Sequence, residues 1–269
     1  MFRLPRQANN FPELVATGDY QGKHLWIVSW MSGYSLAYYW KRFEQGKIDR
    51  PGVWEGVRRS RSLVHALHVL HDHCQIVHGD LKPDNLLIPS DPGGLTLIDY
   101  GSSWQTESTE TRSTGDGYDP WYAAPELVDP AIYGGYVDGR ADQFSAAIIF
   151  YQLLTTTLPY DGLGGRAALP ECRKEAAQSY RSPSELMHER RFLPRKLLRL
   201  IDEVCRRALS FNPEDRFENT RAFCTALDSI WKELQLATHI SSSGARYGLA
   251  HKTMKLIDAG FASLRRWRT

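Results

Sequence analysis

Four stretches of the chain carry apolar residues at helical spacing. In residues 55–74 apolar side chains recur every three or four positions, which predicts a long helix with one buried stripe. Residues 142–155 are apolar on almost every side, as in a helix that lies buried at the centre of a domain. Residues 195–209 and 220–235 predict two further helices. The pattern therefore predicts a mostly helical protein.

Shorter runs of apolar residues predict strands. Residues 25–30, Leu-Trp-Ile-Val-Ser-Trp, are rich in β-branched and aromatic residues and precede a Ser-Gly turn, which predicts a buried strand. A shorter candidate strand at 13–16 would form a hairpin with it. The runs at 86–88 and 95–98 are separated by Ser-Asp-Pro-Gly-Gly, a sequence typical of a hairpin turn. The polar residues 99–125 predict a long loop.

Composition excludes several classes of protein. Of the 269 residues, 42% are hydrophobic, which suffices for a substantial core, and a net charge of +2 gives no general reason to expect nucleic-acid binding. The four cysteines lie far apart, so neither a zinc site nor a disulfide framework is indicated, and a reducing cytosol fits best. Because no segment resembles a signal peptide or a membrane span, we expect a soluble, cytoplasmic protein.

One short loop collects groups that suit phosphate chemistry. Asp80, Lys82 and Asn85 supply a carboxylate, an ammonium and a carboxamide within residues 78–85, between a predicted helix and a predicted strand. A second carboxylate, Asp99, follows the paired strand. Two carboxylates and an amide suit a hard, oxygen-seeking ion such as Mg²⁺, and a lysine can neutralise phosphate charge. This combination is typical of phosphoryl transfer.

Six short motifs of the chain resemble motifs of the protein kinase family and follow that family's order. They correspond to the hinge that holds adenine (28–33), the catalytic loop (78–85), the metal-binding Asp-Phe-Gly (99–101), the end of the activation segment (124–126), the start of the central helix (142–145) and a late arginine motif (212–217). Together the match covers about residues 25–235. Single tripeptides recur by chance, but an ordered series of this kind is specific.

The resemblance implies a role for each matched residue. Asp80 corresponds to the general base and Lys82 to the lysine that neutralises the transferring phosphoryl group, while Asn85 and Asp99 correspond to Mg²⁺ ligands. The implied adenine site consists of Val28, Ser29, Met31, Leu87 and Ile98. Structural roles are implied for His78, Glu126, Asp142 and Arg216. The expected cofactors are therefore ATP and Mg²⁺.

The resemblance also implies a fold class and a division of the chain. We expect an α+β, mostly helical protein: a protein-kinase-like C-terminal lobe with a truncated N-terminal hairpin. Residues 1–30 would be a remnant of the N-terminal lobe, 31–237 the C-terminal lobe, and 238–269 a linker and a C-terminal amphipathic helix. A Ser-Ser-Ser-Gly joint at 241–244 would precede that helix, expected over 249–267. We favour docking of the helix on the C-terminal lobe over contact with a partner protein or an anionic membrane.

Three departures from the family pattern bear on function. Fewer than thirty residues precede the hinge, with no Gly-x-Gly-x-x-Gly, and Lys23 lies in a predicted turn where a phosphate-binding lysine is not expected. Gly79 replaces the arginine that usually reads a phosphate on the activation loop. Asp119 stands where Ser/Thr kinases generally have a threonine beside the catalytic base.

Two functions remain open. The first is an ATP- and Mg²⁺-dependent Ser/Thr protein kinase-like phosphotransferase of minimal form, whose nucleotide site is completed by a partner protein or a homo-oligomer. The second is a pseudokinase that acts as a protein-binding scaffold. We lean toward the enzyme, because a scaffold has no need of Mg²⁺ ligands, and we expect a protein substrate. Lys82 in place of the alanine typical of tyrosine kinases favours a Ser/Thr acceptor.

His-Gly-Asp also occurs in phosphotransferases of the aminoglycoside and choline kinase type, but Ala124-Pro125-Glu126 and Arg216 favour the protein-kinase branch.

Overall fold

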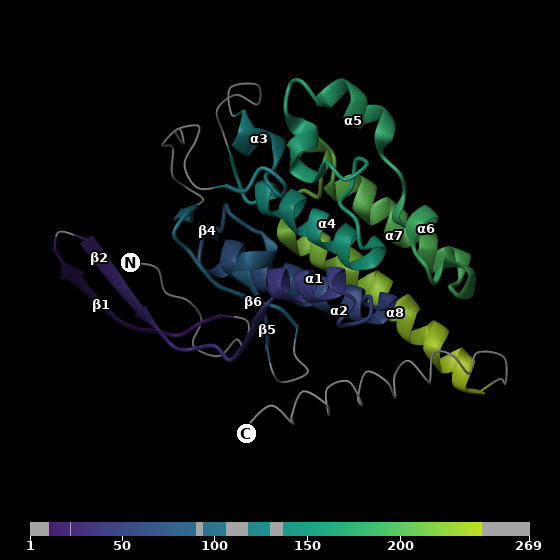
Figure 1. Ribbon diagram of the computed structural model, residues 1–269, viewed down its shortest axis with the longest axis horizontal. Helices are drawn as coiled ribbons and strands as arrows, with labels where there is room; N and C mark the ends of the chain where they lie inside the picture. The colour runs from purple at the N-terminus through teal and green to yellow at the C-terminus, as the bar shows by residue number, and fades with distance from the viewer. Residues whose placement is uncertain (1–10, 22, 90–93, 106–117, 130–136, 244–269) are drawn as a thin grey trace.

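The described chain consists of a β-hairpin close to the N-terminus and a larger, mostly helical body (Figure 1). The computed structural model describes residues 11–21, 23–89, 94–105, 118–129 and 137–243. Within these ranges, no helix is both long enough and apolar enough to cross a membrane. Small sheets beside a helical body agree with the α+β, mostly helical fold class expected from the sequence.

The hairpin pairs β1 (Leu14–Tyr20) with β2 (Lys23–Val28) in antiparallel register. The sequence predicts a buried strand over 25–30, but the strand ends at Val28, and Ile27 and Val28 are 56% and 45% exposed. Consecutive strand residues point to opposite faces, so both faces carry exposed apolar side chains. The prediction of burial is wrong because, in the described ranges, the hairpin forms a two-stranded sheet of its own without further strands to extend it.

Two small sheets hold the loops that carry the polar motifs. The first contains β3 (Gly33–Ser35), β5 (Leu86–Pro89) and β6 (Thr96–Leu97) in the order β3-β5-β6. The β5–β6 pair confirms the predicted second hairpin, with a shorter second strand. The other sheet pairs β4 (Ile76–Val77) with β7 (Trp104–Gln105). The long loop expected from Asp99 onward therefore contains a short strand, while residues 106–117 lie outside the described ranges.

All four predicted helices are present. α2 (Val53–His68) continues into a π-helical turn at Val69–His73, and together they match the helix predicted over 55–74. α4 (Arg140–Thr155) and α7 (Arg195–Ala208) also lie close to the predicted ranges.

The last described helix, α8 (Thr220–Ser243), extends beyond its predicted end. The sequence predicts a flexible joint at 241–244, but the chain is helical through Ser243, so this prediction is wrong over the described residues. Serine is only moderately unfavourable in helices, and a long helix can continue through three serines. The boundary expected at 237 falls inside α8, and the helix expected over 249–267 lies outside the described residues.

Shorter helices complete the body. They are α1 (Leu36–Glu44), α3 (Pro125–Val128), α5 (Arg173–Ser179) and α6 (Pro183–Leu186), with 3-10 turns at Pro83–Asn85, Gly164–Ala168, Arg190–Phe192 and Pro213–Asp215. α1 begins where Ser35 Oγ accepts a hydrogen bond from the Tyr38 amide at 3.1 Å. This N-cap follows directly on β3, so the chain turns into the helical body without a loop.

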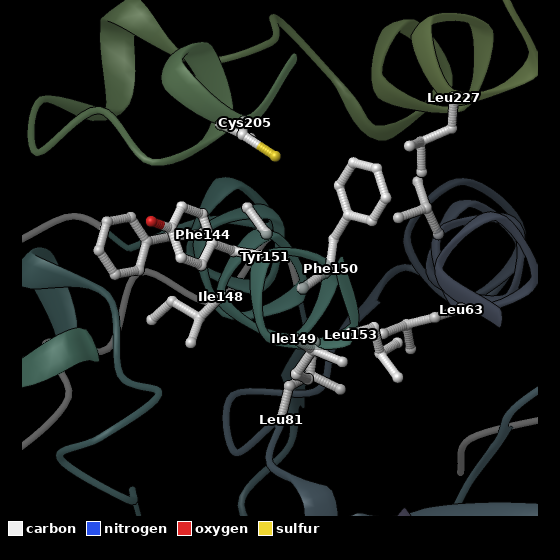
Figure 2. Close-up of a cluster of buried hydrophobic side chains, with 14 of the residues drawn as sticks. Leu63, Leu81, Phe144, Ile148, Ile149, Phe150, Tyr151, Leu153, Cys205 and Leu227 are labelled. Atoms are coloured by element: carbon white, nitrogen blue, oxygen red, sulfur yellow. The ribbon is translucent and has the colours of Figure 1, made fainter. Parts of the chain in front are cut away.

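α4 lies at the centre of the core. Almost every residue of this helix is buried, and α2, α7 and α8 pack against it. Figure 2 shows Phe144, Ile149 and Phe150 leaving α4 in different directions, with Leu63 of α2 and Leu227 of α8 among the residues around them. A helix that is apolar on all sides must be enclosed, which explains its central position.

A buried ion pair joins α3 to the segment that precedes α8. Arg216 donates through Nη1 and Nη2 to the two carboxylate oxygens of Glu126, at 2.6 and 2.8 Å. Both residues are 1% exposed, and the guanidinium lies 4.9 Å from the ring centroid of Phe144 in α4. Because the two charges neutralise one another away from water, the loss of either partner leaves a buried unpaired charge.

Replacement of the arginine tests this account. Arg216→Met keeps the length of the side chain but leaves Glu126 without its partner, so we expect the free energy of unfolding to fall by about 3 to 5 kcal/mol. Urea denaturation measures it. Lys196→Met, which breaks an exposed pair with Glu233, is the matched control and should lose less than about 1 kcal/mol. Equal losses in the two variants would contradict a special role for burial.

Candidate active site

A buried carboxylate fixes the start of the loop that carries the candidate residues. Asp142, in the first turn of α4, accepts hydrogen bonds from the amides of His78 at 2.8 Å and Gly79 at 2.9 Å. Asp142 is fully buried. Gly79 has φ of 77°, a left-handed conformation that glycine adopts without strain. One side chain of the central helix therefore determines the path of the loop backbone.

His71 supports Asp142 from the π-helical turn that follows α2. Its Nε2 lies 2.8 Å from Asp142 Oδ2, and its Nδ1 lies 2.6 Å from Thr220 Oγ1. Burial alone would raise the pKa of Asp142, but the hydrogen bond and charge of His71, with the amide of Gly79, hold that pKa below its usual value. Asp142 is therefore ionised at neutral pH and can accept from both loop amides.

Asp80, Lys82 and Asn85 converge on one another. Lys82 Nζ donates to Asp80 Oδ2 at 2.7 Å, and Asn85 Nδ2 donates to the same oxygen at 3.1 Å. The other carboxylate oxygen of Asp80 accepts from the Asp119 amide at 3.2 Å. Burial would lower the pKa of Lys82, but the hydrogen bond to Asp80 and the charges of Asp119 and Asp84 outweigh it and raise that pKa. The Lys82 side chain is therefore a cation held against the Asp80 carboxylate.

Asp99 lies beside this group through the backbone. The Ile98 amide donates to the Asn85 carbonyl at 3.0 Å, so the chain segments that carry Asn85 and Asp99 are in contact. Asp99 is exposed and has φ of 61°, and its Oδ1 accepts from the Gly101 amide at 3.1 Å. Within the described residues, no hydrogen bond is directed at Asn85 Oδ1 or Asp99 Oδ2. Each side chain therefore has an oxygen that is available to an ion.

The donor set suits Mg²⁺ better than a transition metal. In the described ranges, no three His, Cys, Asp or Glu side chains meet closely enough to hold a metal. Mg²⁺ commonly takes one or two protein oxygens and completes its shell with water and phosphate oxygens. The carboxamide of Asn85 and the carboxylate of Asp99 fit that habit.

His78 links the loop to the strand before Asp99. Its Nε2 lies 3.1 Å from the Ile98 carbonyl, and its Nδ1 accepts from the Asp80 amide at 3.4 Å. The residue is fully buried, and this burial lowers the pKa of His78 despite the nearby charge of Asp142. A neutral ring with its proton on Nε2 satisfies both contacts. His78 therefore packs and bonds as a structural residue.

The expected adenine-binding residues lie on two segments that adjoin. The hinge leads directly into β3, where Ser35 pairs with Leu87 of β5, and Leu87 and Ile98 are half-buried. The amide of Ser29 donates to the Glu13 carbonyl at 2.7 Å, which leaves the Ser29 carbonyl as its backbone group for a base. Val28 is 45% exposed and Met31 half-buried.

Sequence analysis missed two contributors to the site. His71 holds Asp142, and the backbone amide of Asp119 holds Asp80. His71 lies in a π-helical turn, and no known sequence pattern predicts such a turn. A hydrogen bond from a backbone amide cannot be predicted from the residue type, because almost every residue has such an amide. The family resemblance placed Asp119 beside the catalytic base, but it did not predict the hydrogen bond from the Asp119 amide.

The depressed pKa of His78 predicts a pH dependence of stability. Below the ordinary value of 6.5 the unfolded chain takes up a proton at His78 before the folded chain does, so stability falls as the pH decreases. We expect the free energy of unfolding to decrease by up to about 1.4 kcal/mol per pH unit from this group. Urea unfolding at pH values between about 5 and 7 measures the slope. His78→Gln should flatten it and His188→Gln, at an exposed site, should not; an unchanged slope in His78→Gln would refute the prediction.

Comparisons with known proteins agree with this geometry. The family description "Protein kinase domain" matches residues 15–227. Two similar proteins are the serine/threonine-protein kinases pkn3 and Pkn1 of Myxococcus xanthus. They are 28% identical over 166 residues and 30% identical over 178 residues, which is 59% and 64% of this chain. The aligned parts are 28% and 23% of those proteins, so the chain spans about a quarter of their length.

The fold has a solved counterpart. The kinase domain of Mycobacterium tuberculosis PknI superposes with a TM-score of 0.55 and 24% sequence identity, over 83% of this chain and 72% of that domain. At this identity the likeness concerns the fold alone. The family match covers most of the chain, from β1 to α8, and includes the loop held by Asp142. The chain therefore belongs to the protein kinase domain family, as its motifs indicate.

Proposed function

We propose that this chain is an ATP- and Mg²⁺-dependent protein-serine/threonine kinase of minimal form whose nucleotide site is completed by a partner protein or a second copy. The observation that carries the proposal is the convergence of Lys82 and Asn85 on the carboxylate of Asp80, at 2.7 and 3.1 Å. The backbone contact between Asn85 and Ile98 supports it too, because Asp99 is the next residue on that chain segment. A general base, a cation and two oxygen ligands are the components that phosphoryl transfer requires.

Asp80 is oriented for the role of base. Three donors bind its carboxylate: the Lys82 ammonium, the Asn85 amide group and the Asp119 backbone amide. In this arrangement Asp80 would orient an acceptor hydroxyl and take its proton, and Lys82 would offset charge on the transferring group. Asn85 and Asp99 would hold Mg²⁺, which supplies further neutralisation of phosphate charge. The site would accelerate transfer by positioning the reactants and stabilising charge in the transition state, because the protein forms no covalent bond in this reaction.

The acceptor is a serine or threonine on a protein. Lys82 supports this choice, since tyrosine kinases typically have alanine at that point of the loop. The matched relatives are named serine/threonine-protein kinases, which also favours it. The carboxylate of Asp119 adds negative charge beside the base and favours an acceptor segment without acidic residues next to its hydroxyl.

The hairpin supports completion of the site by another polypeptide. The chain contains no Gly-x-Gly-x-x-Gly, the loop that covers the phosphates in complete kinases. β1 and β2 expose apolar side chains on both faces, and Trp30, just after β2, is 90% exposed. Exposed apolar surface of this kind marks an interaction site. A polypeptide that covers the hairpin would lie directly above the hinge and could supply the missing phosphate contacts.

The alternative function is a pseudokinase that acts as a scaffold. The same exposed hairpin favours it, since a surface that holds a partner need not lead to catalysis. The arrangement of Asn85 and Asp99 favours the enzyme, because a scaffold needs no pair of oxygen ligands.

Removal of one charge tests the catalytic proposal. We expect Asp99→Asn to abolish transfer from labelled ATP to protein, since the negative charge that holds Mg²⁺ is lost while asparagine retains the left-handed backbone. Asp80→Asn should reduce transfer by about 100-fold or more. Asp161→Asn, at an exposed aspartate with φ of 55°, is the matched control and should keep full activity. Transfer that survives Asp99→Asn would remove the enzyme from consideration.

The hairpin offers a separate test of completion by a second polypeptide. We expect Ile27→Ser with Val28→Ser to abolish self-association or partner binding, measured by sedimentation equilibrium, together with ATP binding that depends on it. Stability in urea should change little, because both side chains are already about half exposed. Leu236→Ser, at a 47% exposed position on α8, is the control and should leave association intact. Tight binding of ATP with Mg²⁺ by a monomeric chain would contradict this part of the proposal.

A further inference from the structure

Cations gather at one end of the helical body, around α6, the 3-10 turn at Arg190–Phe192 and α7. Residues 181–207 contain eight arginines and lysines and four acidic residues, whereas the whole chain has a net charge of only +2. The rest of the chain is therefore net negative. In Figure 1 this region lies at the opposite end of the long axis from the β1–β2 hairpin.

A shared helix face and two hydrogen bonds show that these cations form one surface. Arg195, Arg199 and Arg206 share a face of α7, opposite the face buried in the core. Arg206 donates to Ser182 Oγ at 3.4 Å, beside Arg181, and Arg190 donates to the Glu185 carbonyl of α6 at 3.0 Å. We name the set the α6–α7 basic surface; it comprises Arg181, Arg190, Arg191, Arg195, Arg199 and Arg206, all exposed.

Three of the four local carboxylates accept hydrogen bonds from backbone or hydroxyl donors, and Glu185 also lies 3.8 Å from Arg181. Glu189 accepts from the Val53 amide at 3.2 Å, Glu185 from the Ser182 amide at 3.0 Å, and Asp202 from the amide and hydroxyl of Ser184 at 2.9 and 2.6 Å. Arg195 and Arg199, by contrast, form no ion pair with the described residues. The outward field of this surface is therefore positive, although Glu203 on α7 reduces it.

The first turn of α7 gives a second indication of an anionic partner. The helix begins with Arg195 and Lys196 and has no acidic residue in its first turn. Cations at the positive end of a helix dipole destabilise the helix, and acidic residues are preferred there. Glu233 pairs with Lys196, but Arg195 forms no ion pair with the described residues. A negatively charged partner in front of this turn removes the repulsion.

An exposed aromatic ring lies among the arginines. Phe192 is 49% exposed, and the guanidinium of Arg191 lies 5.7 Å from its ring centroid. An apolar ring between cations suits the interfacial region of a bilayer, where the ring enters the headgroup layer while the cations meet anionic lipids. We propose that the α6–α7 basic surface docks this protein on an anionic lipid membrane, with Phe192 as its inserted side chain.

The geometry favours a membrane over an acidic peptide. Three of the six arginines lie on α7, two in the 3-10 turn and one just before α6, and a diffuse set of this kind suits the spread charge of a lipid surface. A peptide would bind more tightly in a groove than on an open surface. The groove of about 530 Å³ between α7 and α8 includes Arg207 and Arg221 in its lining and none of the six. Membrane docking would also leave the hairpin, at the other end of the body, free for its partner (Figure 1).

Vesicle sedimentation with the full chain tests the proposal. We expect binding to vesicles of phosphatidylcholine with phosphatidylserine, no binding to phosphatidylcholine alone, and loss of binding in high salt. The triple variant R191E/R195E/R199E should bind at least about 100-fold more weakly. Phe192→Ser should bind about 5-fold more weakly at unchanged charge. The variant K41E/K174E/R221E alters the net charge equally at exposed cations elsewhere and should retain most of the binding.

Three outcomes would overturn the proposal. Equal loss in the two triple variants would mean that net charge alone attracts the protein. Full binding by R191E/R195E/R199E would assign membrane contact to another segment, such as the basic sequence near the C-terminus. Binding to soluble polyglutamate without binding to vesicles would identify an acidic protein as the partner. None of these readouts depends on phosphate transfer, so they are independent of the proposed catalytic function.

Discussion

The rest of the site depends on the hydrogen bonds between the Asp142 carboxylate and the loop that carries Asp80. Asp142 lies in the first turn of a helix that is buried on all sides, so the packing of the core fixes its position. From there it binds two successive amides, those of His78 and Gly79. A buried charge is stable only when its hydrogen bonds are satisfied, and these amides together with His71 satisfy it. The packed core thereby fixes the position of a loop that has little regular structure of its own.

A second buried charge acts at the same end of α4. Arg216 donates to the carbonyl of Arg140, the first residue of the helix, and its guanidinium packs on Phe144 while it binds Glu126. Glu126 follows the segment whose Asp119 amide binds Asp80. The first turn of α4 therefore anchors the catalytic loop through one ion and the end of the activation segment through another. The two chain segments that contact Asp80, the loop at 78–85 and the segment that contains Asp119, are therefore both anchored at one end of α4.

The sequence predicts those parts of the fold that local pattern determines. Apolar spacing identified α2, α4 and α7, because each helix buries a face or its whole surface in the core. The motifs identified Asp80, Lys82 and Asn85, because their spacing within one short loop leaves them little choice but to converge. Features that depend on distant neighbours escaped prediction. His71 is recognisable only once α4 is beside it.

Two predictions from local sequence are wrong: the burial of β2 and the end of the last helix, α8. Residues 25–30 have the composition of a buried strand, but composition reports what a strand prefers to contact and not whether that contact is present. Ile27 and Val28 are exposed because, in the described ranges, no further strand extends the sheet. The three serines at the end of α8 suggested a joint, although a helix of 24 residues tolerates them. The first error therefore has a tertiary cause, and the second comes from reading too much into a weak local preference.

The charges of the site bear on our proposal that a second polypeptide completes it. The charges of Asp80, Asp84 and Asp119 act on Lys82, which is already bonded to Asp80. A polyphosphate meets net repulsion in such surroundings, and its approach depends on positive charge brought from elsewhere. Mg²⁺ at Asn85 and Asp99 would supply part of it. Under our proposal, the remainder comes from a polypeptide that attaches to the exposed apolar faces of the β1–β2 hairpin.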